Sequence, residues 1–192
     1  HLEKGYDLTY HKLSISYASR KTFIKRNIYS WQIKKPIFKN FINYGNPIAS
    51  SSVIIKKSLI NQINGFSEDK KLMGAEDFDA WIKCSYFSNS FKYINKTLGY
   101  YLIGDDNSSN IKTALSNIFY LKSKYLIRIK IFNKEFPYLM KYQLSSIYFR
   151  KKKFKVSFLL SRQIIFHPFR FSIFIKTFLI YIISLTRYKF RI

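Results

Sequence analysis

Residues 74–81, Gly74-Ala-Glu-Asp-Phe-Asp-Ala-Trp81, place three carboxylates within four positions and follow them with a tryptophan. The chain as a whole is strongly basic, with 34 Lys and Arg against 10 Asp and Glu in 192 residues. Five of those ten acids fall between Glu68 and Asp79, and two more are the adjacent pair Asp105 and Asp106. Because acids are scarce in this chain, their grouping indicates that they serve catalysis, helix capping or both.

The positive charge is uneven along the chain. Residues 1–111 contain 16 basic and 9 acidic side chains, whereas residues 112–192 contain 18 basic side chains and a single acid, Glu135. Such an excess is typical of proteins that bind nucleic acid or anionic lipid. The abundance of Lys, Ile, Asn, Phe and Tyr also fits an AT-rich genome, which raises the lysine content without a functional cause. Codon bias does not account for the difference between the two halves.

The single Cys84 excludes an internal disulfide and suits a reducing compartment. Its place within an apolar helical pattern predicts a buried thiol. No apolar signal segment is visible at the N-terminal end of the sequence, so nothing in it argues for secretion.

Hydrophobic periodicity predicts an α/β region over residues 1–111 and a mostly helical, basic region over residues 112–192. Residues 20–45 are interpreted as irregular chain, with Pro36 and Gly45 as breaks. The rest of the α/β region is predicted to contain a strand over 8–17, a short strand over 50–55, a helix over 56–63, a helix from residue 76, and a strand, turn and strand over 91–103.

The second region mixes Ile, Leu, Phe and Tyr with Lys and Arg. Its pattern predicts helices over 112–133, 138–150, 153–166 and 170–186, with a break at His167-Pro168. The apolar run 171–185 is shorter than the roughly 20 residues that span a bilayer. Two interpretations stay open for this region: an amphipathic anchor lying on anionic lipid, and a helical hairpin whose lysines are simply solvated.

The acids of the opening motif fall in the first turn of a predicted helix, because Phe78, Trp81, Ile82 and Tyr86 recur at helical spacing. A carboxylate there can accept the proton of a hydroxyl group within hydrogen-bond reach. The same carboxylate can instead cap the helix and interact with the positive end of its dipole. The spacing alone leaves both roles open.

Three further segments flank this motif in a fixed order. The full set is the serine-rich strand Ser50-Ser-Ser-Val-Ile-Ile55, the turn Gly65-Phe-Ser-Glu68, the helix start Glu76-Asp-Phe-Asp-Ala-Trp81 and the strand Leu98-Gly-Tyr-Tyr101. Together they resemble the second half of the family 2 glycosyltransferases, which have the Rossmann-like GT-A fold. The resemblance covers residues 5–110 and implies a partial GT-A domain followed by a helical tail.

The resemblance implies roles for particular residues. Asp77 would be the general base that deprotonates an acceptor hydroxyl, which then attacks the anomeric carbon of a nucleotide-activated sugar with inversion. Glu76 would flank the acceptor, and Ser51 and Ser52 would line the floor of the site or merely form a structural strand. Trp81 would stack on a sugar face or pack in the core.

The chain departs from the family pattern after its last predicted strand. Many relatives have a histidine there, near the metal and the diphosphate, whereas this chain has Gly104-Asp-Asp-Asn-Ser-Ser109. Asp105 and Asp106 are candidate ligands for a hard divalent cation, Mg²⁺ or Mn²⁺. The same run is also an ordinary turn and helix cap.

A second departure concerns the donor side. In the family, the nucleotide-binding strands and an Asp-x-Asp metal motif precede the part that matches, and residues 1–10 resemble the segment just after that motif. We therefore expect an acceptor-side half of the enzyme, inactive and poorly soluble alone. The expected donor is a nucleotide-sugar, and the expected acceptor is a glycan or a lipid-linked glycan of bacterial surface polysaccharide.

The expected location is cytoplasmic, peripheral on the inner face of the inner membrane. The alternative is a basic protein without catalysis that binds a membrane surface or nucleic acid. The sequence has no zinc-ligand spacing and no RNP-like strand, and acids at 76–79 and 105–106 would repel phosphates. Nucleic acid is thus the less favoured partner.

Overall fold

A computed structural model describes residues 5–17, 27–28, 30–103, 111–125, 127, 138–165 and 171–189. The chain divides into two compact units, residues 1–121 and 122–192. The division falls later than the compositional boundary at residue 111 because most of helix α4 (Ile111–Lys124) belongs to the first unit. Within that unit, Asn117 donates a hydrogen bond of 3.1 Å to the Met73 carbonyl, and the Tyr120 hydroxyl donates to Asp69.

The first unit contains a three-stranded mixed sheet in the order β2-β1-β3, so the α/β class is confirmed at this level. Strand β1 (Leu8–Tyr17) lies in the centre, antiparallel to β2 (Val53–Ile55) and parallel to β3 (Phe91–Ile103). The predicted bounds of β1 are confirmed. The second half of the predicted 50–55 strand forms β2, while Ser50–Ser52 make a 3-10 turn.

The prediction of a strand, turn and strand over 91–103 is wrong, because β3 is one continuous strand. Its residues pair with β1 from Leu8 to Tyr17, and the register shifts on both sides of Lys12. These shifts accommodate Asn95 and Lys96, which have no partner residue in the register between His11 and Lys12. Gly99 lies opposite Leu13, where an added Cβ would come within 3.1 Å of the leucine side chain.

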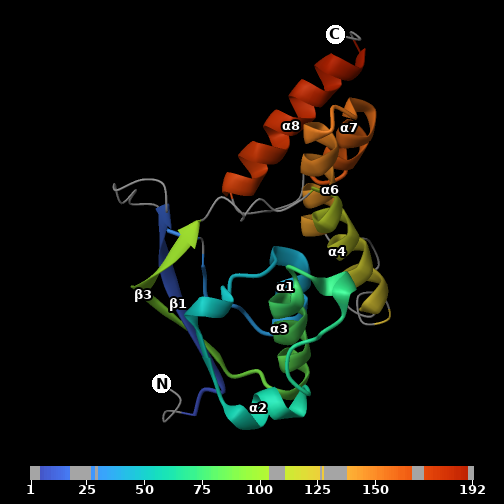
Figure 1. Cartoon of the computed structure of the whole chain (residues 1–192). Helices are drawn as coiled ribbons and strands as arrows, with labels where there is room; N and C mark the ends of the chain where they lie inside the picture. The colour runs from blue at the N-terminus through green and yellow to red at the C-terminus, as the bar shows by residue number, and fades with distance from the viewer. Residues whose placement is uncertain are drawn as a thin grey trace. The chain divides into compact units, whose positions relative to one another are not determined.

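The helices of the first unit gather beside the sheet (Figure 1). They are α1 (Ile37–Tyr44), α2 (Lys57–Gln62), α3 (Glu76–Phe87) and α4. The interpretation of residues 20–45 as irregular chain is wrong where α1 forms. Its apolar residues Ile37, Phe38, Phe41 and Ile42 recur at helical spacing and are all buried, a short pattern that the neighbouring lysines obscured.

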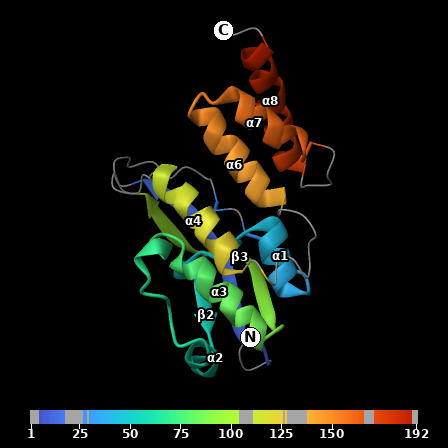
Figure 2. The ribbon, with the colours of Figure 1, turned by 90° about the vertical axis from the view of Figure 1, so that its right-hand side faces the viewer.

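Helices α1 and α3 lie on the same side of the sheet in both orientations (Figures 1 and 2). Phe41 of α1 is fully buried between them, edge-on to Phe78 of α3 at 5.7 Å and to Phe91 of β3 at 6.3 Å between ring centres. Aromatic pairs in this geometry add to the stabilisation by burial. This contact fixes the N-terminal turn of α3 against α1.

The second unit is a helical bundle of α6 (Tyr138–Arg150), α7 (Phe154–Arg162) and α8 (Phe171–Lys189). Hydroxyl groups occupy its centre. The Ser157 hydroxyl donates to the Ser145 carbonyl at 2.9 Å, and the Ser184 hydroxyl lies 3.0 Å from the Ser157 hydroxyl. All three serines are fully buried. Within the described residues, no helix combines the length and the apolar character needed to cross a membrane.

Candidate functional site

The first turn of α3 brings together the residues that the sequence singled out. The chain approaches it through a 3-10 turn, Lys70–Leu72, which Asp69 caps by accepting a hydrogen bond of 2.9 Å from the Lys71 amide. Gly74 then adopts φ 80°, a conformation that side chains disfavour, and the helix begins at Glu76 as predicted. Its N-cap is Ala75, whose side chain offers no capping oxygen.

The Asp77 carboxylate is half-buried at this helix start, and its two oxygens have different neighbours. Oδ1 accepts a hydrogen bond of 2.5 Å from the Phe78 amide, one of the first-turn N–H groups that a helix leaves unsatisfied. Oδ2 lies 3.5 Å from the Asn46 side-chain nitrogen, at the long end of the hydrogen-bond range. One oxygen thus supports the helix end, and the other has remaining capacity to accept a proton.

Burial raises the pKa of Asp77 above its ordinary value, and the negative charge of Glu76 beside it acts in the same direction. The hydrogen bonds from Phe78 and Asn46 oppose this shift. A carboxylate with a raised pKa is a stronger base than an exposed one once it is ionised. Desolvation at the helix start therefore increases the proton affinity of this carboxylate.

The two neighbouring acids are engaged elsewhere. The exposed Glu76 folds back so that its carboxylate accepts a hydrogen bond of 2.6 Å from the Gly74 amide. Asp79 is fully buried, and its Oδ2 lies 3.1 Å from the Lys83 ammonium one turn along the helix. Asp77 is half-buried and has a raised pKa, while Glu76 and Asp79 hold the loop and the helix.

Trp81, Ser51 and Ser52 have different surroundings from Asp77. Trp81 is fully buried and packs edge-on against Phe66 at 5.6 Å, so its ring has no face open to a sugar. Ser52 is also buried, and its hydroxyl donates to the Ala49 carbonyl at 2.8 Å. Ser51 is exposed. The side chains of Trp81 and Ser52 are thus occupied in packing and turn formation.

The candidate metal ligands Asp105 and Asp106 lie outside the described residues. Among the residues that are described, no three His, Cys, Asp or Glu side chains come together in a group able to hold a metal ion. These residues therefore do not provide a ligand set for the Mg²⁺ or Mn²⁺ that the resemblance implies.

Sequence reasoning missed Asn46 as a site residue. Its side-chain oxygen accepts a hydrogen bond of 3.0 Å from the Ile48 amide, which holds the side-chain nitrogen toward Asp77. The available signal was the Asn46-Pro47 pair, because asparagine before proline favours a turn in which the asparagine side chain bonds the backbone two residues on. Its contact with residue 77 depends on the fold.

Comparison with known proteins adds no assignment: no protein-family model, no curated protein and no solved structure matches the chain. Function is therefore inferred from the chain's own residues.

Proposed function

We propose that this chain is the acceptor-side part of an inverting glycosyltransferase of the GT-A type, with Asp77 as the general base. The observation that carries the proposal is the Asp77 carboxylate, which is half-buried at the start of α3, has a raised pKa and points one oxygen toward Asn46. The ordered motifs around it, similar to those of family 2 glycosyltransferases, supply the substrate class.

In the proposed reaction, Asp77 Oδ2 accepts the proton of an acceptor hydroxyl as the hydroxyl oxygen bonds to the anomeric carbon of the donor sugar. The bond from that carbon to the nucleoside diphosphate breaks on the opposite face, and the diphosphate leaves with the electron pair. The Asn46 amide and the Phe78 N–H orient the carboxylate for this proton transfer. A divalent cation remains a prediction for the complete enzyme.

The donor-binding part is proposed to come from a complementing nucleotide-binding segment. Strand β3 supports this, because Leu98, Tyr100 and Leu102 occupy alternate positions on it and are 59, 67 and 60% exposed. Sheets with parallel strands are usually covered on both faces. An apolar row of this kind suits a covering layer that brings the donor site.

The coding sequence on the 5′ side of the codon for His1 offers the first test. We expect it to encode strands and an Asp-x-Asp motif, either in frame or after a frameshift. If it encodes neither, the GT-A proposal fails, and binding to lipid or nucleic acid becomes the leading account.

The mechanistic test is Asp77→Asn in the complete enzyme. Loss of a general base lowers kcat by about 10²–10⁴-fold, and we expect KM to change little. Release of nucleoside diphosphate from a panel of nucleotide-sugars measures the rate. The matched control is Glu68→Gln, an exposed acid in the same acidic stretch, which should retain activity. Full activity of Asp77→Asn would remove Asp77 from the mechanism.

We further propose that the second unit binds the surface of an anionic membrane. Apolar residues such as Leu144 and Ile147 are buried in it beside Ser145, Ser157 and Ser184, while large apolar side chains are exposed on α8, namely Phe174, Ile175, Phe178, Leu179, Ile182 and Ile183. An exposed apolar face on a helix of this kind is typical of helices that lie on a membrane surface. Exposed Arg187 and Lys189 at the end of α8 add attraction to anionic head groups.

Vesicle co-sedimentation tests this location. The chain should sediment with vesicles of phosphatidylcholine and phosphatidylglycerol, and about tenfold less with phosphatidylcholine alone, because each basic residue near an anionic surface contributes about 1 kcal/mol. The double variant Phe178→Asn, Ile182→Asn should lose binding, whereas Lys57→Gln in the first unit should not. Equal sedimentation of the double variant and the parent chain would contradict the proposal.

A further inference from the structure

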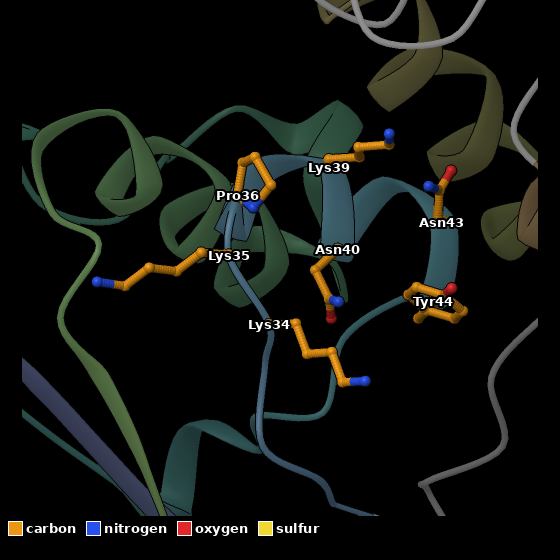
Figure 3. Close-up of a pocket in the computed structure, with 7 residues that line it drawn as sticks. All are labelled: Lys34, Lys35, Pro36, Lys39, Asn40, Asn43 and Tyr44. Atoms are coloured by element: carbon orange, nitrogen blue, oxygen red, sulfur yellow. The ribbon is translucent and has the colours of Figure 1, made fainter.

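A pocket of about 230 Å³ lies along one side of α1, from the segment before the helix to its last turn, within the first unit (Figure 3). It is formed by the approach segment and by one side of the helix. Its lining residues are Lys34, Lys35, Pro36, Lys39, Asn40, Asn43 and Tyr44. Asp77 and the other residues of the proposed transferase site are not among them, so the pocket is a separate feature.

The pocket is cationic. Three of its seven lining residues are lysines and none is acidic, and all three lysines are exposed at its rim. The first turn of α1 contains no acidic residue that would neutralise them. These features favour an anionic ligand.

The Asn40 side chain indicates that the ligand is more than a simple anion. Asn40 is only 9% exposed, and its side-chain oxygen is buried without a hydrogen-bond partner among the described residues. A buried acceptor without a partner is destabilising and uncommon in folded proteins. Figure 3 shows this amide pointing toward the Lys34 side chain. A ligand held there by Lys34 is therefore in position to donate a hydrogen bond to Asn40.

We propose that this pocket binds a sugar phosphate, with the phosphate on Lys34 and a neighbouring sugar hydroxyl donating to Asn40 Oδ1. Phosphate matches the charge, and a hydroxyl supplies the donor that sulfate and other fully ionised anions lack. The volume corresponds to that of several water molecules, at roughly 30 Å³ each in the liquid, and suits a small polar ligand. The sugar phosphate is either a free metabolite or the exposed head group of a lipid.

Calorimetric titration of the full chain at low salt tests the site. We expect saturable binding of glucose 6-phosphate, at least about tenfold weaker binding of sulfate, and no binding of glucose, because both the charge and the hydroxyl are needed. Affinity should fall as salt rises, since the lysines are exposed. Equal affinity for sulfate and glucose 6-phosphate, or no saturable binding, would overturn the proposal.

Two variants locate the binding. Lys34→Gln removes an exposed charge and should leave the fold intact. It should weaken the binding of glucose 6-phosphate about tenfold. Asn40→Leu should weaken the binding of glucose 6-phosphate but leave the weak binding of sulfate unchanged. The matched control is Lys57→Gln on α2, an exposed lysine outside the pocket, which should bind like the parent chain. Unchanged binding by Lys34→Gln would place the ligand elsewhere.

The two sources of the ligand are distinguished by competition. Vesicles of phosphatidylcholine with phosphatidylinositol 4-phosphate are titrated with the chain in the presence and absence of glucose 6-phosphate. Binding that depends on Lys34 and is tighter on the vesicle than in solution identifies a lipid head group. Tighter binding of the free compound identifies a soluble sugar phosphate. If binding depends on Lys34 in neither assay, the proposed site is wrong. These outcomes are independent of Asp77 activity, so the pocket and the proposed transferase function can fail separately.

Discussion

Asp77 combines the two roles that the sequence left open. One carboxylate oxygen accepts the hydrogen bond from Phe78 at the helix start, and the other faces Asn46. Structural and catalytic roles are therefore compatible at this residue, because a carboxylate has two oxygens with several acceptor positions. The residue is half-buried and its pKa is raised, so ionised Asp77 costs some folding free energy.

Asp77→Asn should change how the stability of the protein depends on pH. Because the folded pKa is raised, the folded state binds more protons than the unfolded state between the two pKa values. The contribution of Asp77 to stability is thus present below its unfolded pKa and is lost as pH rises through the folded pKa. At pH 7, Asp77→Asn should therefore be more stable than the parent chain, with a higher Tm.

Thermal unfolding followed by circular dichroism from pH 4 to pH 8 measures this difference. The extra stability of Asp77→Asn over the parent chain should decrease as the pH falls, since protonated Asp77 is uncharged like asparagine. Glu68→Gln, which changes an exposed acid, should show no comparable trend. A variant that is less stable than the parent chain at pH 7 would mean that the carboxylate is needed to hold the helix end.

Cys84 shows how burial determines reactivity at the residue scale. The prediction of a buried thiol is confirmed, and burial raises the pKa of the thiol to about 12. The thiolate is the nucleophilic form, so almost none of this cysteine is reactive near pH 7. The residue serves the packing of α3, and no redox role is supported.

At the scale of elements, α3 is anchored by Trp81. Its ring is fully buried against Phe66, while its indole N–H has no hydrogen-bond partner among the described residues. Trp81→Ala should therefore destabilise the protein by about 3–5 kcal/mol. Trp81→Phe keeps an aromatic ring and removes the unsatisfied donor, so it should cost about 1.5 kcal/mol or less.

Urea denaturation of the two variants measures these free energies of unfolding. The alanine variant should lose several times more stability than the phenylalanine variant, and the slope with urea should be unchanged. Equal losses would show that the indole N–H makes a bond through water or that only the full indole fills the site.

Helix starts were predicted well, but the predicted helix over 112–133 is wrong at its C-terminal end, because α4 ends at Lys124. Helices α3 and α6 begin at the predicted residues, and α7 and α8 begin within one residue of them. The short helix α1 and the unbroken strand β3 were missed, because each depends on partners distant in sequence. Eight residues are too few for a helix to be stable without such packing.

At the scale of the whole molecule, both units have apolar cores, and the second also contains a cluster of buried hydroxyl groups. The first buries Tyr10, Phe41 and Trp81, whereas the second buries apolar residues such as Leu144 together with Ser145, Ser157 and Ser184. The uneven charge of the sequence distinguishes the two regions, but the buried hydroxyl cluster follows only from the tertiary structure.

The whole chain is expected to associate with itself through strand β3. The exposed row Leu98, Tyr100 and Leu102 on β3 should cause self-association at micromolar concentration, because exposed apolar strands promote contacts between chains. Leu98→Ser with Leu102→Ser should shift the chain toward the monomer in analytical ultracentrifugation. Lys96→Ser, an exposed substitution on the same strand, is the control. A fully monomeric parent chain would contradict the need for a covering layer.

The sequence by itself determined the charge division, the mixed α/β class, the helix that begins at Glu76 and the burial of Cys84. These properties follow from local periodicity and composition, which depend on neighbouring residues. Only the tertiary structure decided that Asn46 approaches Asp77, that Trp81 is closed to solvent and that the Asn40 oxygen has no hydrogen-bond partner among the described residues. Each of these depends on contacts between segments far apart in the chain, and no local pattern encodes which segments will meet.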